Sequence, residues 1–314
     1  MCYSAQLQAA YLRYLRETGA QMDIDQFVEI FGARITDSSI RIPRAVERWF
    51  DEPQIHEHWP DGARKIKGFI DEWRATEITK LEREVFAQKK RLADAERTLA
   101  TKTTKAATES QRIATNKIEQ ALTRLDRMKA VQPHPAEARI FPLHYAPLVM
   151  QDGDRRVMRL ARYHCRLPGE AAFIDRKLPG LYNARRDSLG KYWKGLFGLS
   201  HAVMLVDSFF ENVDREGKNQ VLHFVPKPAG TMLIACLFAE WRDPKGGSPL
   251  LSFAAITDEP PPEVAAAGHD RMIINLKPEN LDAWLSPQGR SLEEMQRILG
   301  DRQAPYYEHE VMAA

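Results

Sequence analysis

Residues 62–130 constrain the fold most, because this stretch contains almost no glycine or proline and is rich in Ala, Glu, Lys and Arg. Such a composition is typical of long, exposed helices. The apolar positions at heptad spacing in its first half are Ile78, Leu81, Val85, Leu92, Ala95 and Leu99. The polar residues 101–105 predict a break, after which Ile118, Leu122 and Leu125 begin a second amphipathic stretch. We therefore expect an antiparallel helical hairpin or a short coiled coil.

The net charge of +2 is distributed unevenly. Residues 64–129 carry 17 Lys and Arg against 10 Asp and Glu, and residues 151–195 carry 11 against 5. Two basic segments suggest a surface that faces a polyanion, although a solvated helix face explains the first segment equally well. The predicted hairpin is therefore either a structural, self-associating or partner-binding arm, or an arm whose basic face contacts nucleic acid.

Pro133 and Pro135 close this stretch, and short β-type runs separated by Gly and Pro follow it. The predicted strands cover residues 148–150, 157–161, 201–209, 222–225, 232–241, 251–256 and 272–276. Because few helices lie between them, they predict a mostly antiparallel, barrel-like α+β domain rather than a doubly wound sheet. A last helix is expected over residues 292–299, followed by a polar tail.

The N-terminal segment predicts a helix over residues 4–17, with Ser4 as its N-cap and Gly19 as its C-terminal stop. Shorter helices are expected over residues 25–31 and 43–50. Cys2 would then lie at a helix N-terminus, where the helix dipole lowers the pKa of a thiol.

The composition is that of a soluble protein, with 44% hydrophobic and 28% charged residues. No apolar run approaches the roughly 20 residues of a membrane span, and no signal peptide is visible, so we expect a cytoplasmic protein. Cys2, Cys165 and Cys236 are too far apart for a zinc motif or a disulfide framework, and we expect Cys165 and Cys236 to be buried. No cofactor or metal is expected.

Met1-Cys2 has a chemical consequence, because aminopeptidases remove an initiator methionine that precedes a small residue such as cysteine. Cys2 would then carry a thiol and a free α-amine, and this amine titrates at about pH 7.7–8.0. Such an aminothiol condenses with an aldehyde to a Schiff base, which the thiolate closes to a thiazolidine ring.

Four polar motifs accompany this cysteine. They are Tyr145-Ala146-Pro147, Asn183-Ala184-Arg185, Phe209-Phe210-Glu211 and His269-Asp270-Arg271-Met272. In this order the motifs resemble the SOS-response-associated peptidase (SRAP) family, whose eukaryotic members sense abasic sites in single-stranded DNA. The resemblance covers Met1-Cys2 and residues 136–287. The family pattern departs at Tyr3-Ser4, Asp187 and Asn212, which affects the expected DNA contacts more than the chemistry.

The resemblance implies a division into residues 1–19 (the catalytic cysteine and first helix), 20–135 (a helical insertion), 136–290 (the SRAP-like β-rich core) and 291–314 (the last helix and tail). It also implies that Cys2 caps abasic sites in single-stranded DNA, that autoproteolysis removes the residue ahead of Cys2, and that a lyase activity accompanies these. Such a protein would associate with the nucleoid when bound to DNA.

The implied catalytic residues are Cys2, Asn183, Glu211 and His269. A Glu/His pair supplies the proton transfers of sugar opening and ring closure, and an amide such as that of Asn183 orients the aminothiol. The expected DNA contacts are Arg185, Arg186, Arg162 and Tyr163, although Tyr163 and Trp193 are equally good core residues.

Two other functions fit the sequence. In an N-terminal-nucleophile hydrolase, the α-amine acts as base for the Cys2 thiol and Asn183 stabilises the oxyanion. In a non-enzymatic coiled-coil interaction protein, the β-rich domain is only a platform.

Overall fold

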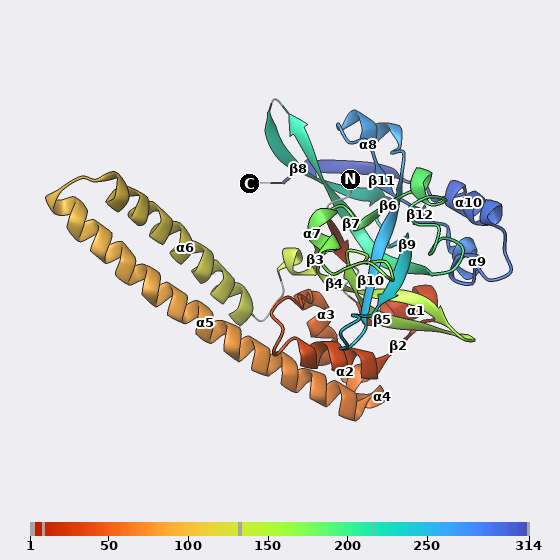
Figure 1. Cartoon of the computed structure of the whole chain (residues 1–314), viewed down its shortest axis with the longest axis horizontal. Coiled ribbons are helices and arrows are strands. Elements are labelled where there is room, and N and C mark those ends of the chain that lie inside the picture. The colour runs from red at the N-terminus through yellow and green to blue at the C-terminus, as the bar shows by residue number, and fades with distance from the viewer. Residues whose placement is uncertain (1–3, 8–9, 131–133, 216, 313–314) are drawn as a thin grey trace.

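A computed structural model describes residues 4–7, 10–130, 134–215 and 217–312 (Figure 1). The helices are α1 (Tyr11–Thr18), α2 (Ile24–Ala33), α3 (Arg44–Glu47), η1 (Arg48–Asp51), α4 (Pro53–His58), α5 (Pro60–Thr101), α6 (Lys105–Lys129), η2 (Pro135–Ala138), α7 (Ile174–Lys177), η3 (Arg186–Ser188), α8 (Pro262–Ala266), η4 (Pro278–Asn280), α9 (Leu281–Leu285) and α10 (Leu292–Gly300). The strands are β1 (Ser4–Leu7), β2 (Gln21–Met22), β3 (Arg139–Ile140), β4 (Tyr145–Asp152), β5 (Arg155–Tyr163), β6 (Asn183–Arg185), β7 (His201–Arg215), β8 (Lys218–Lys227), β9 (Met232–Trp241), β10 (Leu250–Asp258), β11 (Met272–Ile273), β12 (Asn275–Leu276) and β13 (Tyr306–Val311).

The central strands form a closed ring. Strand β4 pairs with β5, β5 with β10, β10 with β9, β9 with β7, and β7 again with β4. All of these pairings are antiparallel except β5 with β10. Closure removes free edges, and the barrel strands are buried almost continuously, which explains their long apolar runs. The predicted mostly antiparallel α+β barrel is confirmed.

The N-terminal segment differs from the prediction. Residues Ser4–Leu7 form strand β1, which lies between β7 and β3, so Ser4 caps no helix. Helix α1 begins at Tyr11 and ends, as expected, at Gly19, whose φ of 68° gives the left-handed C-cap that glycine adopts at low cost. The expected helix-dipole effect on the Cys2 thiol therefore has no structural basis, and Cys2 itself lies outside the described residues.

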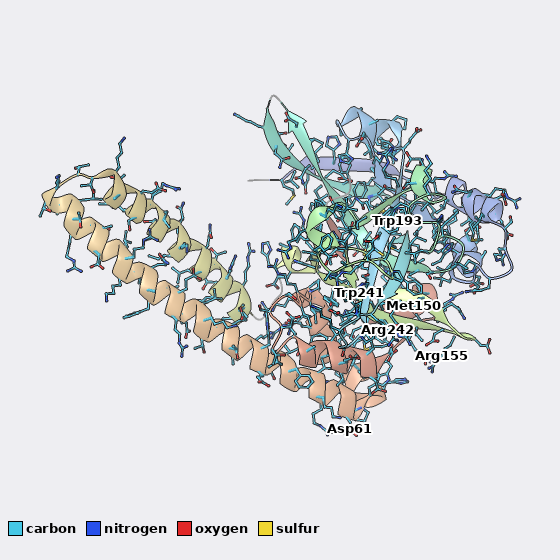
Figure 2. All side chains as sticks on the ribbon, viewed as in Figure 1. Asp61, Met150, Arg155, Trp193, Trp241 and Arg242 are labelled. Carbon is cyan, nitrogen blue, oxygen red and sulfur yellow. The ribbon has the colours of Figure 1, made fainter. Side chains whose placement is uncertain are left out.

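The helical hairpin is confirmed, and it extends from the body as an arm (Figure 1). Its two helices, α5 and α6, pack through a small cluster of Leu81, Val85, Ala121 and Leu125. The chain turns at residues 102–104, where the Thr104 side chain accepts a hydrogen bond from the Ala107 N–H and caps α6. In Figure 2 the side chains of the arm radiate into open space on either side of this narrow seam.

The first part of the expected insertion packs into the main hydrophobic core. Phe27, Phe31, Trp49 and Phe50 are fully buried there, and strand β2 pairs with β5. The early turns of α5 join the same core, through residues that include Ile66 and Ile70. Only the part of the hairpin beyond these turns projects from the body.

Three ionic contacts hold the base of the arm. Glu47, which is 2% exposed, lies 2.6 Å from Arg34 and 2.9 Å from Arg74 of α5. Where the chain returns, Arg44 contacts Glu137 at 2.9 Å and donates to the backbone carbonyl of Ala130 at 2.7 Å. Breaking a buried pair of the first kind typically costs about 3–5 kcal/mol, so these contacts fix the direction of the arm.

The expected polar tail contains a strand, β13. It pairs antiparallel with β8 over its whole length, although Tyr307 is its only buried residue among those described. Helix α10 matches the predicted last helix. Within the described residues, we find no helix long and apolar enough to cross a membrane.

Candidate functional site

Glu211 lies on β7, the strand that is central to the sheet, and its side chain is completely buried. Strand β8 pairs with β7 on one side, where Leu222 lies opposite Glu211. On the other side, Ser4 of β1 lies opposite Phe210, the residue before Glu211. Strand β1 therefore begins opposite the residue that precedes Glu211.

His269 reaches Glu211 from the loop that follows α8. Gly268, with a φ of 100°, makes the turn that precedes it, and the loop continues into β11. His269 is 7% exposed, and its Nε2 lies 3.1 Å from Oε2 of Glu211. Its Nδ1 lies 2.6 Å from the backbone carbonyl oxygen of Arg271. Two groups far apart in the sequence are thus brought into direct contact.

The hydrogen bonds of His269 specify where protons lie. A carbonyl oxygen only accepts, so Nδ1 carries the hydrogen that is donated to Arg271. A neutral ring of this tautomer presents a lone pair at Nε2, which a carboxylate oxygen would repel. Nε2 is therefore the ring atom that faces the Glu211 carboxyl group, and burial lowers the pKa of His269.

Asn183 occupies strand β6, which runs parallel to β10 with Asn183 opposite Ala255. Its Oδ1 accepts a hydrogen bond from the Tyr163 hydroxyl at 3.3 Å. The segment after β6 is tied to the His269 loop, because Arg271 lies 3.5 Å from Asp187. The three predicted catalytic residues within the described part of the chain thus lie on adjoining segments, and Glu211 and His269 are in direct contact.

A cationic and aromatic stack next to this site escaped the sequence analysis. The Arg139 guanidinium lies 3.7 Å from the centre of the Phe210 ring and donates to Ser4 Oγ at 2.8 Å. On Phe210 stacks His223, with the two ring centres 4.4 Å apart. No local pattern could have signalled these residues, because they come from three strands that only the sheet brings together.

The predicted DNA contacts divide into exposed and structural residues. Arg185 is 49% exposed and pairs with Asp187 at 2.7 Å, so it can exchange that partner for a phosphate. Arg186 instead bonds to Asp258 and to both the side chain and the backbone of Gln296. It holds η3 against α10, which leaves little of its charge for a ligand.

Arg162 and Tyr163 are less exposed than the sequence predicts. The Arg162 guanidinium is 12% exposed and contacts Asp175 at 2.9 Å. Tyr163 is 1% exposed and stacks on Phe253, so its ring offers no free face to a base. Trp193 is also core, at 3% exposed, and Figure 2 places it within the β-rich body. Tyr163 and Trp193 are therefore core residues, whereas a DNA contact of Arg162 stays a prediction.

The two described cysteines take no part in this site. Cys165 and Cys236 are free thiols and completely buried, as expected, and burial raises the pKa of both. Over the described ranges, no group of three or more His, Cys, Asp or Glu side chains could hold a metal ion.

A comparison with family models matches residues 99–313 to the SOS response associated peptidase (SRAP) family. This range is more than half of the chain. The chain belongs to the SRAP family. The matched SRAP range contains Asn183, Glu211 and His269, whereas Cys2 lies outside it.

Curated SRAP relatives of this chain include the abasic site processing protein YoqW of Bacillus subtilis (strain 168). It is 28% identical over 123 residues, which cover 38% of this chain and 54% of that protein. The protein of the same name from Bacillus phage SPbeta matches equally. The chain thus spans about half the length of the curated relatives that it matches.

Solved structures similar to this SRAP chain include a protein from Bacteroides thetaiotaomicron, with 14% identity and a TM-score of 0.48 over 56% of this chain and 77% of that one. A protein from Bordetella bronchiseptica has 18% identity and a TM-score of 0.46, and covers 56% of this chain and 88% of the other. Both scores lie below 0.5, and the barrel assignment rests on the strand pairing described above.

Proposed function

We propose that this protein recognises abasic sites in single-stranded DNA and caps them covalently through the N-terminal Cys2 after Met1 removal. The observation that carries the proposal is the buried contact between Glu211 and His269 in a chain of the SRAP family. The printed name of the YoqW relatives, abasic site processing protein, supports the same class of substrate.

The chemistry needs an aldehyde, an aminothiol and a proton carrier. An abasic sugar opens to an aldehyde, whose carbon is attacked by the Cys2 α-amine to give a carbinolamine. Loss of water leaves an imine, and the Cys2 sulfur then adds to the imine carbon while the nitrogen takes up the proton. The product is a thiazolidine. The carbinolamine hydroxyl must be protonated to leave, and an acid–base pair such as Glu211 and His269 suits this step.

Strand β1 supplies the tether that this mechanism requires. Ser4 is completely buried opposite Phe210, next to Glu211, and Cys2 precedes Ser4 by two residues. Two residues of extended chain span at most about 7 Å. Cys2 itself lies outside the described residues, and we propose that this short connection lets its amine and thiol reach the Glu211 and His269 pair.

The mechanism also needs a side chain that binds the DNA strand and positions it without taking part in the reaction. Arg185 is the best candidate, because it is largely exposed and immediately follows the Asn183-Ala184 pair on β6. Its present partner Asp187 is itself 57% exposed, so the exchange of that carboxylate for a phosphate costs little.

The N-terminus gives the decisive test. Four proteins are mixed with abasic single-stranded DNA and separated by denaturing electrophoresis: processed wild type, a form that retains Met1, Cys2→Ser and Cys2→Ala. Only the processed wild type should give a stable, heat-resistant adduct. Cys2→Ser should give an imine that borohydride traps, because a hydroxyl is a far poorer nucleophile than a thiolate.

The control is DNA of the same sequence without the abasic site, which should give no adduct with any protein. A stable adduct from the Met1-retaining form would exclude the aminothiol mechanism. It would favour a simple thiol nucleophile, as in the N-terminal-nucleophile hydrolase without participation of the amine.

A further inference from the structure

A cavity of about 670 Å³ lies beside the site, between the segment after β3 and the segment before β6. Ten residues line it, among them Arg41, Phe141, His144, Pro179, Tyr182 and Asp175, whose carboxylate is paired with Arg162 and Arg166. Its volume is within the range of about 300–1,000 Å³ that is usual for small-molecule pockets. Neither Glu211 nor His269 belongs to this lining.

Residues that line the cavity on two sides share contacts with residues of the site. Phe141 follows β3, and its ring and that of Phe210 both contact the Arg139 guanidinium, at 4.8 and 3.7 Å. Tyr182 directly precedes Asn183 and packs edge-on against Tyr163, whose hydroxyl donates to Asn183. A molecule in the cavity would therefore contact Tyr182, the residue before Asn183. It would also contact Phe141, which packs against the same guanidinium as Phe210.

The walls of the cavity present flat apolar surfaces. Phe141 and Tyr182 are aromatic, and Pro179 adds a rigid ring. Leu143, at the mouth, is 44% exposed and has a φ of 73°, an unfavourable backbone conformation for leucine. A hydrogen bond from the Leu143 N–H to the Tyr163 carbonyl at 2.7 Å holds it there. Residues kept in such conformations are concentrated at ligand clamps.

The cavity also contains polar groups suited to a base and its phosphate. Nδ1 of His144 is buried and has no hydrogen-bond partner among the described residues. Burial lowers the pKa of His144 to about 4, so the ring is neutral at pH 7 and offers one donor and one acceptor. At the rim, Arg41 is exposed, and no carboxylate of the described chain lies within ion-pair distance of it.

We propose that this cavity binds an unstacked nucleobase of the single strand, that of the nucleotide next to the abasic position. The base stacks against Phe141 and Tyr182, its edge bonds to His144, and its phosphate lies at Arg41. This inference rests on the proposed function for the identity of the strand. An intact base beside the abasic position would then contribute part of the affinity for DNA. The capping reaction itself does not require that base.

The test combines a protein variant with a change in the DNA. Phe141→Ala should weaken binding of an unmodified single-stranded oligonucleotide by about tenfold or more, the range expected for one lost stacking partner. The matched control is Phe86→Ala, which removes a phenylalanine that is 75% exposed on the arm, and should leave binding unchanged. Fluorescence anisotropy measures both affinities, and thermal unfolding checks that each variant folds cooperatively.

The second part of the test uses abasic oligonucleotides in which the nucleotide on the 5′ or the 3′ side of the abasic position is replaced by a tetrahydrofuran spacer, which carries no base. On one of the two sides, loss of the base should slow capping by wild type about tenfold, and Phe141→Ala should show no further loss. His144→Phe keeps the ring volume and removes the nitrogen, so it should bind with altered preference among the four neighbouring bases.

The outcomes separate the two proposals. Absence of any adduct with wild type would overturn the proposed function, while the anisotropy comparison would still judge the cavity. Equal affinity of wild type and Phe141→Ala for the intact strand would overturn the nucleobase assignment. If Phe141→Ala does not fold, an unchanged base preference in His144→Phe, or equal capping whichever neighbouring base is missing, would overturn it.

Discussion

Nε2 of His269 lies 3.1 Å from Oε2 of Glu211, and both side chains are buried. Nδ1 of His269 donates to the Arg271 carbonyl, so Nε2 is the ring atom directed at the carboxyl group. A carboxyl group and an imidazole in direct contact are groups that can act as general acid and general base. Such a pair suits a reaction that must both protonate a leaving hydroxyl and accept a proton from an amine.

Removal of either partner should slow the chemistry without preventing it. We expect His269→Ala and Glu211→Gln to slow adduct formation or reversal by roughly 10²–10⁴-fold, the usual contribution of a positioned acid or base. Rates are measured with abasic single-stranded DNA by quenched time courses, after thermal unfolding shows that both variants are folded. Wild-type rates of formation and of reversal in one variant would remove that residue from the site.

Arg185 and Arg186 should respond differently to substitution, despite being neighbours. Arg185→Ala should weaken single-strand binding and reduce the slope of log affinity against log salt by about 0.7, because one phosphate contact is lost. Arg186→Ala should instead lower the midpoint of thermal unfolding, since it breaks bonds to Asp258 and Gln296. An unchanged salt slope for Arg185→Ala would show that this arginine does not contact the strand.

Shortening the arm should be tolerated only beyond its base. Deletion of residues 89–118 with a short flexible linker keeps Val85 and Ala121 in contact, and we expect cooperative unfolding and unchanged capping. Deletion of residues 62–130 removes Ile66 and Ile70 from the core, at about 2–5 kcal/mol for each large residue, and should prevent folding. Loss of capping in a folded 89–118 deletion would place DNA contacts on the distal arm.

His201 predicts a loss of stability in acid. The Gly198 N–H donates to its Nε2 at 2.8 Å, and its Nδ1 donates to the Trp284 carbonyl at 3.0 Å, so the folded state requires a neutral ring. Burial lowers its pKa from 6.5 to about 4. The unfolded chain therefore takes up the proton first, and stability falls as pH drops from about 6.5 towards 4, by about 3 kcal/mol at the lower limit.

Urea unfolding at pH 7 and pH 5 measures this effect. The free energy of unfolding should decrease at pH 5 in wild type and decrease less in His201→Gln, which has no titrating ring. The pKa of His144 is also lowered, so His144 contributes to the loss of stability in acid, and this contribution remains in His201→Gln. An equal decrease in wild type and variant would exclude His201 as a source of the acid sensitivity.

The sequence by itself determined the elements whose stability is local or whose burial is complete. The heptad residues Ile78 and Val85 specify an amphipathic helix wherever that segment lies. Strands β7 and β9 are visible as apolar runs, because strands buried on both faces need apolar side chains at nearly every position. The Asn183, Glu211 and His269 motifs could also be recognised in order along the chain.

Only the tertiary structure decided what depends on neighbours distant in sequence. Residues Ser4–Leu7 and β13 are strands because β7 and β8 offer them unpaired backbone groups, and neither segment has a local pattern that signals this. Burial likewise decided that Tyr163 supports Asn183 rather than a base. Glu211 and His269 are in contact because strand β7 and the loop after α8 approach each other to within 3.1 Å at these side chains, and a charge interaction of that kind depends on distance and burial rather than on sequence spacing.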